Sequence, residues 1–304
     1  MVACIGEPLV TFAANGGGRF VDADLVEVGE GGAELNVAVH LARLGTAVRF
    51  IGAVGADALG DRIEWRLSRE GVDTSWLVRD ADAPTGAYLK DASTGATSMV
   101  YFRTGSAASR FGEVPDGALD GVRHLHVSGI TAALSPACDA LVERLLTGKR
   151  TFTVSFDVNY REQLWPPGVA AGRLRTLANL ADVVLVGRDE SARLWGTSAP
   201  ESVRALLPDV PELVVKDDSA AAHVWTGRGV VSVAPVSFAV VEPVGAGDAF
   251  AAGFIYARGQ GRPPAVALRL GHTLARAALS ATDDLGEPVP TDVLDAVLAQ
   301  EQIR

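Results

Sequence analysis

The sequence predicts an α/β fold in which helices cover both faces of a mostly parallel sheet, and three observations lead to this class. Short apolar runs rich in β-branched residues alternate with helical patterns along most of the 304 residues. The apolar runs are continuous, as expected for strands that are covered on both faces. No linker, repeat or low-complexity tract divides the chain, so residues 1–304 are expected to form one domain.

Apolar runs supply the expected strands, and the segments between them supply helices. Residues 33–45 carry apolar side chains at helical spacing and end at Gly45, a residue typical of helix ends. Residues 136–146 begin with a proline, which suits the first position of a helix. The expected strands are residues 48–55, 124–129, 152–159, 182–187 and 212–217.

Two segments depart from this alternation. Residues 10–30 and 82–104 are rich in glycine, threonine and aromatic residues, with alternating stretches such as TGAYLK and SMVYFR. This pattern is typical of short antiparallel strands. The two segments are expected to form a small sheet, or lid, that projects from the main domain over a site. Two ordinary surface hairpins are the alternative.

Composition and charge exclude several classes of protein. The net charge of −10 disfavours nucleic acid as a partner, although a few local arginines suffice to bind a small anion. No apolar run reaches the roughly 18–20 residues of a membrane span. The N-terminus lacks the pattern of a secretory signal, so a cytoplasmic protein is expected. Cys4 and Cys138 are expected to pack as small apolar residues, in preference to a disulfide or metal site.

The stretch EPVGAGDAFAAGF, residues 242–254, places an acid between a glycine-rich turn and a helical pattern. Gly245 and Gly247 permit backbone angles that let successive N–H groups converge on one point. The unpaired N–H groups of the following helix add a partial positive charge, which favours an anion such as phosphate. A tight turn with Asp248 as an ordinary first-turn acid is the alternative interpretation.

This stretch resembles the C-terminal signature of the ribokinase-like (PfkB) sugar kinases, usually written DTTGAGDAF. The resemblance implies a three-layer α/β/α sandwich and a kinase that uses ATP and Mg²⁺. It implies that Gly245, Ala246 and Gly247 form an anion hole and that Asp248 is the catalytic base. Phosphoryl transfer depends mostly on positioning and charge stabilisation, so a carboxylate that orients the attacking hydroxyl suits the chemistry.

A second signature of this family lies near the N-terminus, in GGAELNVAVHLARLG followed by FIGAVGADALGD. Members of the family bind the sugar with the Gly-Gly turn and the asparagine of this helix. The resemblance therefore assigns sugar binding to Gly31, Gly32 and Asn36. For Asn36, a solvent-facing position on the helix is the alternative.

Three further stretches resemble the 2-keto-3-deoxygluconate kinases of the family. DVNYREQLW supplies Arg161, YFRTGSAASR supplies Tyr101 and Arg103, and TGAYL supplies Tyr88 at a lid position. A sugar acid carries a carboxylate, which the planar guanidinium of arginine binds with two parallel hydrogen bonds. The arginines are expected to select acids over neutral sugars. Surface salt bridges for the arginines, and packing within the lid for the tyrosines, are the alternatives.

The nucleotide side departs from the family pattern. In GRDE, Gly187 stands where the family has asparagine, while Glu190 remains as the acid that acts on magnesium through water. In KDDSAAA, Lys216 is kept as a nucleotide-binding residue together with Gly245 and Gly247, but the glycines of the family's KxGxxG are lost. The aspartates that follow Lys216 are expected to weaken ATP binding by repulsion or to alter donor preference. Glu242 replaces an aspartate near a monovalent-cation site, which argues against a potassium requirement.

The leading hypothesis is an ATP- and Mg²⁺-dependent kinase for the terminal hydroxyl of 2-keto-3-deoxygluconate. A PfkB kinase for a neutral sugar, fructose or ribose, is one alternative. A sugar-acid-binding regulator with weakened ATP use is another. GEGGAE is not the GxGxxG of a dinucleotide-binding unit, which argues against a nicotinamide enzyme. Because projecting sheets in this family often pair between subunits, a homo-oligomer through the lid sheet is expected.

Overall fold

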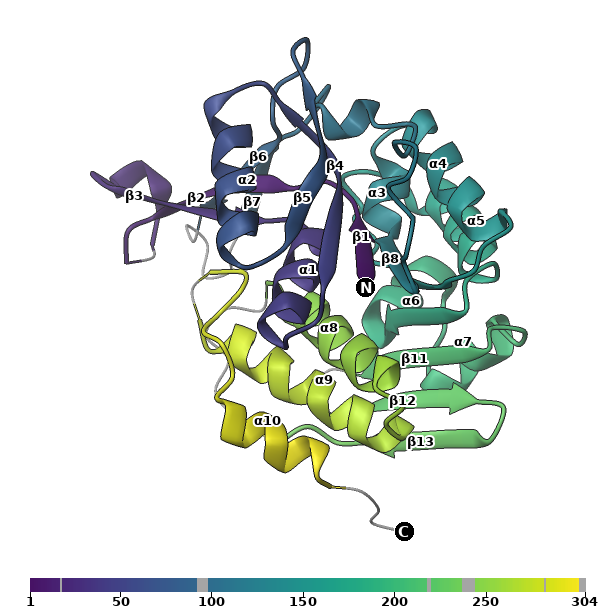
Figure 1. Ribbon diagram of the computed structural model, residues 1–304. Coiled ribbons are helices and arrows are strands. Elements are labelled where there is room, and N and C mark those ends of the chain that lie inside the picture. Colours follow the sequence, from purple (N-terminus) through teal and green to yellow (C-terminus); the bar gives the residue numbers. More distant parts are fainter. Residues whose placement is uncertain (17, 92–97, 218–219, 237–243, 282, 301–304) are drawn as a thin grey trace.

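In the computed structural model, residues 1–16, 18–91, 98–217, 220–236, 244–281 and 283–300 are described (Figure 1). Their main sheet has the strand order β13-β12-β11-β10-β9-β8-β1-β4-β5. Neighbouring strands from β5 to β11 run parallel, and the β11–β12 and β12–β13 pairs are antiparallel. The strands are β1 (Val2–Ile5), β4 (Val48–Gly55), β5 (Asp73–Asp80), β8 (His124–Ser128), β9 (Thr153–Asp157), β10 (Val183–Gly187), β11 (Glu212–Asp217), β12 (Ala221–Thr226) and β13 (Gly229–Val233).

Helices cover both faces of this sheet, as the sequence predicts. One buried cluster packs α4 (Pro136–Thr147), α5 (Pro167–Ala178), α6 (Arg188–Trp195) and α7 (Pro200–Leu206) against one face. A second cluster packs four other helices against the opposite face. These are α1 (Ala33–Arg43), α2 (Ala58–Arg69), α8 (Ala246–Gly259) and α9 (Pro264–Leu279), while α3 (Gly129–Ala133) and α10 (Thr291–Leu298) are shorter additions. The fold is therefore the predicted three-layer α/β/α sandwich.

A smaller sheet projects from the main domain (Figure 1). It consists of β2 (Leu9–Ala14), β3 (Val26–Gly31), β6 (Ala87–Asp91) and β7 (Ser98–Phe102) in the order β3-β2-β6-β7. The predicted lid is present, and the pairs β2–β3 and β6–β7 are antiparallel as expected, whereas the central pair β2–β6 that joins them is parallel. The reason is topological: β2 follows β1 and β6 follows β5, and β1 and β5 point the same way in the main sheet.

All five predicted strands are confirmed within a few residues, as are the predicted helices over residues 33–45, over residues 136–146 and after the Gly245–Gly247 turn. The missed strands are short, polar or peripheral. β5 (DTSWLVRD) is a half-exposed edge strand, and β12 and β13 form an antiparallel hairpin at the other edge. Cys4 and Cys138 are both buried and free, as expected for small apolar residues.

The carboxyl ends of the parallel strands collect polar residues at one edge of the sheet. Glu7 follows β1, residues 157–161 end and follow β9, and Lys216 is the penultimate residue of β11. The turn before α8 reaches the same place, because it shares a cavity with Asp157 and Lys216. In open α/β sheets, ligands bind at this edge, so the fold places a candidate site there. No helix within the described ranges has the length and apolar character needed to cross a bilayer.

Candidate active site

The turn before α8 requires glycine and leaves backbone N–H groups without an acceptor inside the helix. Gly245 has φ +81°, and a Cβ on it would lie 2.1 Å from the carbonyl oxygen of Asp284, so only glycine fits there. The helix begins at Ala246, and the first intrahelical bond joins the Ala249 N–H to the Gly245 carbonyl at 2.9 Å. The preceding N–H groups have no acceptor within the helix and lie beside a cavity that Gly245 and Gly247 line.

Asp248, in the first turn of α8, is held by two amides. Asn36 Nδ2 donates to its Oδ2 at 2.9 Å, and Asn159 Nδ2 reaches its Oδ1 at 3.5 Å. Burial raises the pKa of Asp248 to about 7; the Asn36 hydrogen bond opposes this rise and the Asp157 charge adds to it. A carboxyl group with a pKa near neutrality is suited to accept a proton at physiological pH.

Asn159 is a site residue that the sequence analysis missed. It lies in the DVNYR stretch, from which only Arg161 was assigned. Its φ of +42° is in the left-handed region, which asparagine tolerates better than most residues. An asparagine two residues beyond the end of a buried parallel strand is the signal that could have revealed it, because such positions face the ligand edge of the sheet.

One cavity of about 230 Å³ lies between the lid and α1. Six of the seven predicted sugar-binding residues line it: Gly32, Asn36, Tyr88, Tyr101, Arg103 and Arg161. Gly31 does not line it, but a Cβ there would lie 2.6 Å from the Tyr88 hydroxyl, so glycine at this position makes room for the tyrosine. Asn36 is buried, which rules out the solvent-facing alternative, and its Oδ1 has no hydrogen-bond partner among the described residues.

The charge of Arg103 is already balanced within the protein. Its guanidinium forms an ion pair with Glu7, and both side chains are buried. Glu7 also accepts a hydrogen bond from the Ser106 hydroxyl at 2.6 Å. Burial raises the pKa of Glu7, although the Arg103 charge opposes this. Arg103 is therefore not a surface salt bridge, and Glu7 is a second cavity residue that the sequence analysis missed.

Arg161 differs from Arg103 because its charge is available. Its Nη1 donates to the backbone carbonyl of Tyr160 at 3.1 Å. Within the described part of the chain, no carboxylate forms an ion pair with it. Arg161 lines the first cavity, here called the sugar-side cavity after its predicted lining residues, and also a second cavity of about 170 Å³. It can therefore meet an anionic group on a ligand at the junction of the two cavities.

The second cavity, here called the nucleotide-side cavity because the predicted nucleotide-binding residue Lys216 lines it, shares Gly245, Asp248 and Arg161 with the first. Lys216 also lines it, and its Nζ is 2.9 Å from the buried carboxylate of Asp157. Burial acts to lower the pKa of Lys216, but the carboxylates of Asp157 and Glu190 overcome this and raise it. The ammonium is therefore fixed in its charged form.

Glu190 lines the nucleotide-side cavity and also fastens two loops. It accepts hydrogen bonds from the backbone N–H of Tyr160 and, at 3.0 Å, from that of Gly187. Within the described ranges, no cluster of three metal-ligating side chains occurs. The pair Asp157 and Glu190 nevertheless fits Mg²⁺, which proteins commonly hold with one or two carboxylates plus phosphate oxygens and water.

The aspartates that follow Lys216 were expected to repel the phosphates of ATP, and this repulsion is partly offset. Asp217 forms an ion pair with Arg188 at the start of α6, so its charge is balanced. Asp218 and Glu242, which bear on donor preference and on potassium, lie outside the described residues. At Gly187, an added Cβ would lie 3.5 Å from the Cβ of Glu190, an ordinary van der Waals contact, so a side chain at this position is not excluded by the backbone.

Comparison with known proteins decides the family. The model of the pfkB family of carbohydrate kinases matches residues 1–292. The chain belongs to this family. It is a sugar kinase and, like the family, uses a nucleotide.

Individual relatives agree along nearly the whole chain. The kinase is 33% identical to a 2-dehydro-3-deoxygluconokinase of Bacillus subtilis, over 98% of this chain and 95% of that one. It superposes on a PfkB protein from Polaromonas sp. JS666 with a TM-score of 0.86 at 32% identity, over 97% and 98% of the two chains. A fructokinase with bound ATP from Xylella fastidiosa gives a TM-score of 0.84 at 27% identity, over 98% of each chain.

The raised pKa of Asp248 has a consequence for stability. Its folded pKa of about 7 lies above the ordinary value of 3.8, so its stabilising contribution is present below pH 4 and is lost as pH rises through 7. We expect Asp248→Asn to increase the free energy of unfolding at pH 8 by about 1–3 kcal/mol, with the gain vanishing near pH 4. Urea denaturation from pH 4 to pH 8 measures it. Asp209→Asn, the same change at an exposed residue, is the control; a gain for Asp248→Asn that does not vary with pH contradicts the account.

Proposed function

We propose that this kinase transfers the γ-phosphoryl group of ATP to the terminal hydroxyl of 2-keto-3-deoxygluconate, the sugar acid also called 2-dehydro-3-deoxygluconate. The observation that carries the proposal is the position of Asp248 at the junction of the two cavities, with Arg161 beside it. The relative from Bacillus subtilis, named for this sugar acid, supports the choice of substrate.

In this mechanism the terminal hydroxyl points at Asp248 from the sugar-side cavity. As its oxygen bonds to the γ-phosphorus, its proton passes to the Asp248 carboxylate and the bond from phosphorus to the ADP oxygen breaks. The N–H groups of Gly245, Ala246 and Gly247 stabilise the charge on the transferring group. Asn36 keeps the carboxylate oriented through its 2.9 Å hydrogen bond.

The nucleotide side supplies positive charge for the phosphates. Lys216 is charged and lines the cavity, where Asp157 fixes its position. When bound, Mg²⁺ would neutralise phosphate charge, and Asp157 and Glu190 would hold it directly or through water. Because Glu190 already accepts two backbone hydrogen bonds, contact through water suits it better than direct coordination.

Recognition of the sugar acid is divided among the other cavity residues. Arg161 supplies the positive charge for the carboxylate, and Arg103 offers Nε, which has no partner among the described residues. Tyr88 donates its hydroxyl hydrogen to Asp284, so towards a ligand it acts as an acceptor. Asn36 Oδ1 is a further open acceptor for a sugar hydroxyl.

A neutral-sugar kinase remains the second candidate, and one observation favours it. The Glu7–Arg103 pair is internally balanced, so half of the expected arginine pair carries no free charge. The similarity to a fructokinase supports the same reading. The two candidates differ in the role of Arg161, because a sugar acid has a carboxylate that the Arg161 guanidinium can bind, whereas a neutral sugar has none.

A substrate panel separates these functions. We expect ATP-dependent phosphorylation of 2-keto-3-deoxygluconate with a kcat/KM at least about 100-fold above that for fructose or ribose. Arg161→Met should lower kcat/KM for the acid by about 100-fold and for the neutral sugars by less than about threefold. Asp248→Asn should lower kcat by about 1,000-fold while both ligands still bind.

Other outcomes select the alternatives. Faster turnover of fructose or ribose, unaffected by Arg161→Met, would identify the neutral-sugar kinase. Binding of the acid without binding of ATP–Mg²⁺ in calorimetry would identify the regulator. Near-normal turnover of Asp248→Asn would contradict the assignment of Asp248 as the catalytic base. Arg193→Met, which also lines the nucleotide-side cavity but not the sugar-side one, is the matched arginine control for substrate choice.

We also propose a homodimer that forms through the outer face of the lid. In the strand register Phe12 lies opposite Val28 and Leu89, and Leu89 lies opposite Val100, which forms one apolar row across four strands. Val28 and Val100 are 40% and 48% exposed, and Phe102 is 60% exposed. Light scattering should give twice the chain mass, and Val100→Lys should give one chain mass; a wild-type monomer at micromolar concentration contradicts this.

A further inference from the structure

Asp284 lies where the lid meets the site, although nothing in the sequence analysis marked it. It is 3% exposed and lines the sugar-side cavity. Its carboxylate accepts the hydrogen of the Tyr88 hydroxyl and lies 2.6 Å from Lys90 Nζ. Tyr88 and Lys90 both belong to lid strand β6, so this carboxylate ties the lid to the segment that follows α9. A buried ion pair of this kind favours one geometry strongly, because separating the charges leaves each without compensation.

Asp284 also packs against two glycines of the site, Gly245 before α8 and Gly31 before α1. A Cβ on Gly245 would lie 2.1 Å from the backbone carbonyl oxygen of Asp284. A Cβ on Gly31 would lie 2.7 Å from its Oδ2. Asp284 therefore packs closely against both glycines, and we expect a displacement of Asp284 to displace the turn before α8. The side chain of Asp284 therefore contacts the lid, and its backbone packs against the turn before α8.

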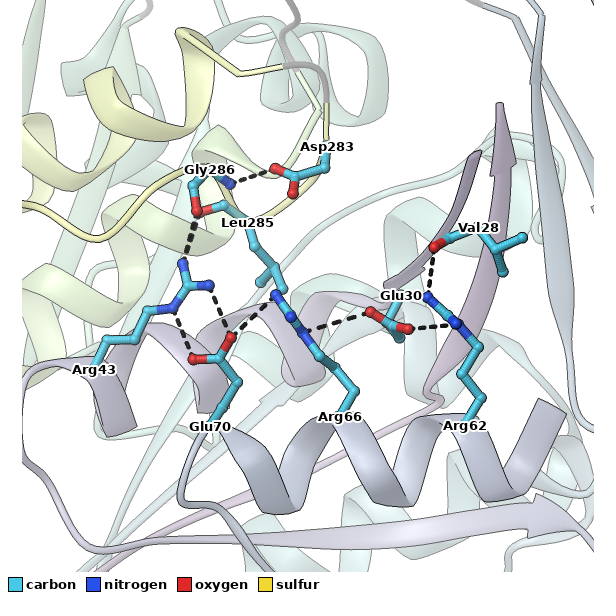
Figure 2. A network of polar contacts seen from close by, with 9 residues as sticks. All are labelled: Val28, Glu30, Arg43, Arg62, Arg66, Glu70, Asp283, Leu285 and Gly286. Atoms are coloured by element: carbon cyan, nitrogen blue, oxygen red, sulfur yellow. Dashed lines mark hydrogen bonds and ion pairs between the residues drawn. The ribbon is translucent and has the colours of Figure 1, made fainter. Parts of the chain in front are cut away.

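The segment Asp283–Gly286, here called the 283–286 loop, is also held from its other side (Figure 2). Arg43 of α1 donates to the carbonyl of Gly286 at 2.8 Å, and Asp283 Oδ1 accepts from the Gly286 N–H at 2.6 Å. Arg43 in turn makes two hydrogen bonds of 2.9 Å to Glu70. The charged side chains of Arg43 and Glu70 therefore hold the 283–286 loop on the side away from the lid strand β6.

A chain of ion pairs connects Glu70 to lid strand β3 (Figure 2). Glu70 pairs with Arg66 at 3.0 Å, and Arg66 reaches Glu30 at 3.5 Å. Glu30, on lid strand β3, pairs with Arg62 at 2.7 Å. Lid strands β3 and β6 are therefore both connected to the 283–286 loop, one through the arginines of α2 and the other directly through Asp284.

We propose that Asp284 is a positioning residue that couples the lid to the anion-binding turn, so that a sugar acid in its cavity tightens binding of the nucleotide phosphates. The coupling rests on the proposed function for the identity of its two ligands. A ligand that orders Tyr88 and Lys90 fixes the Asp284 carboxylate, and the Asp284 carbonyl then fixes Gly245. By linkage, the nucleotide must tighten sugar-acid binding by the same factor.

Calorimetry on the whole chain tests this coupling. We expect saturating 2-keto-3-deoxygluconate to lower the Kd of a non-hydrolysable ATP analogue with Mg²⁺ by about 5–50-fold, and the reverse to hold equally. Asp284→Asn should reduce this factor below about twofold while the analogue alone binds within about threefold of wild type. Lys90→Met removes the same ion pair from the lid side and should also reduce the factor, which provides a second test if Asp284→Asn does not fold.

The control is Asp139→Asn, which removes an aspartate–arginine pair between α4 and α5, away from the lid. It should keep the full coupling factor. Retention of the factor in folded Asp284→Asn or Lys90→Met overturns the proposal, as does a wild-type protein that binds both ligands without mutual tightening.

Hydrogen exchange without ligands separates this proposal from the proposed function. Asp284→Asn should raise amide exchange both in residues 87–91 and in residues 245–249, whereas Asp139→Asn should raise neither. A wild-type protein that binds neither ligand contradicts the proposed function, and the exchange result then still decides the coupling. Unchanged exchange at residues 245–249 in Asp284→Asn overturns it.

Discussion

The hydrogen bond between Asn36 and Asp248 is the interaction on which the site depends. It joins two side chains 212 residues apart, each in the first turns of a helix that begins at the carboxyl edge of the sheet. Each helix starts at a glycine with positive φ, Gly32 at +125° and Gly245 at +81°, and each glycine abuts a backbone carbonyl. The approach of two helix starts brings a desolvated carboxylate next to unpaired N–H groups. Binding of an anion and acceptance of a proton can then occur at one point.

The charges around this point are almost balanced before a substrate arrives. Glu7 pairs with Arg103, Asp157 with Lys216, and Asp284 with Lys90. Asp248 and Arg161 complete the set without a direct ion pair between them. A sugar acid would supply the anion that Arg161 lacks, and the proton from the attacking hydroxyl would neutralise Asp248 as the product forms. The balance explains how a chain with a net charge of −10 can bind two anionic ligands.

Features of the fold and the site could be predicted from the sequence where a local residue pattern reflects a requirement of burial or of backbone conformation. Strands that are buried on both faces are continuous apolar runs, and Gly245 before α8 is required by its φ of +81°, so both were visible in the sequence. The parallel β2–β6 pair, Glu7 and Asp284 were not, because their roles arise from contacts between distant segments. Glu7 is identifiable only once its partner Arg103, 96 positions away, folds onto it. Asp284 carries no motif at all, and its importance comes from what packs on either side of it.

The most direct test of this account is the titration of the Asp248 carboxyl group. Carbon-13 NMR of the aspartate side chains, with the signal assigned by its loss in Asp248→Asn, gives the pKa without ligands or turnover. The account requires a midpoint of about 7, set by burial beside Asn36 and Asp157. A midpoint near the ordinary 3.8 would show that the carboxylate is well solvated, and a desolvated base at the junction of the two cavities would be contradicted.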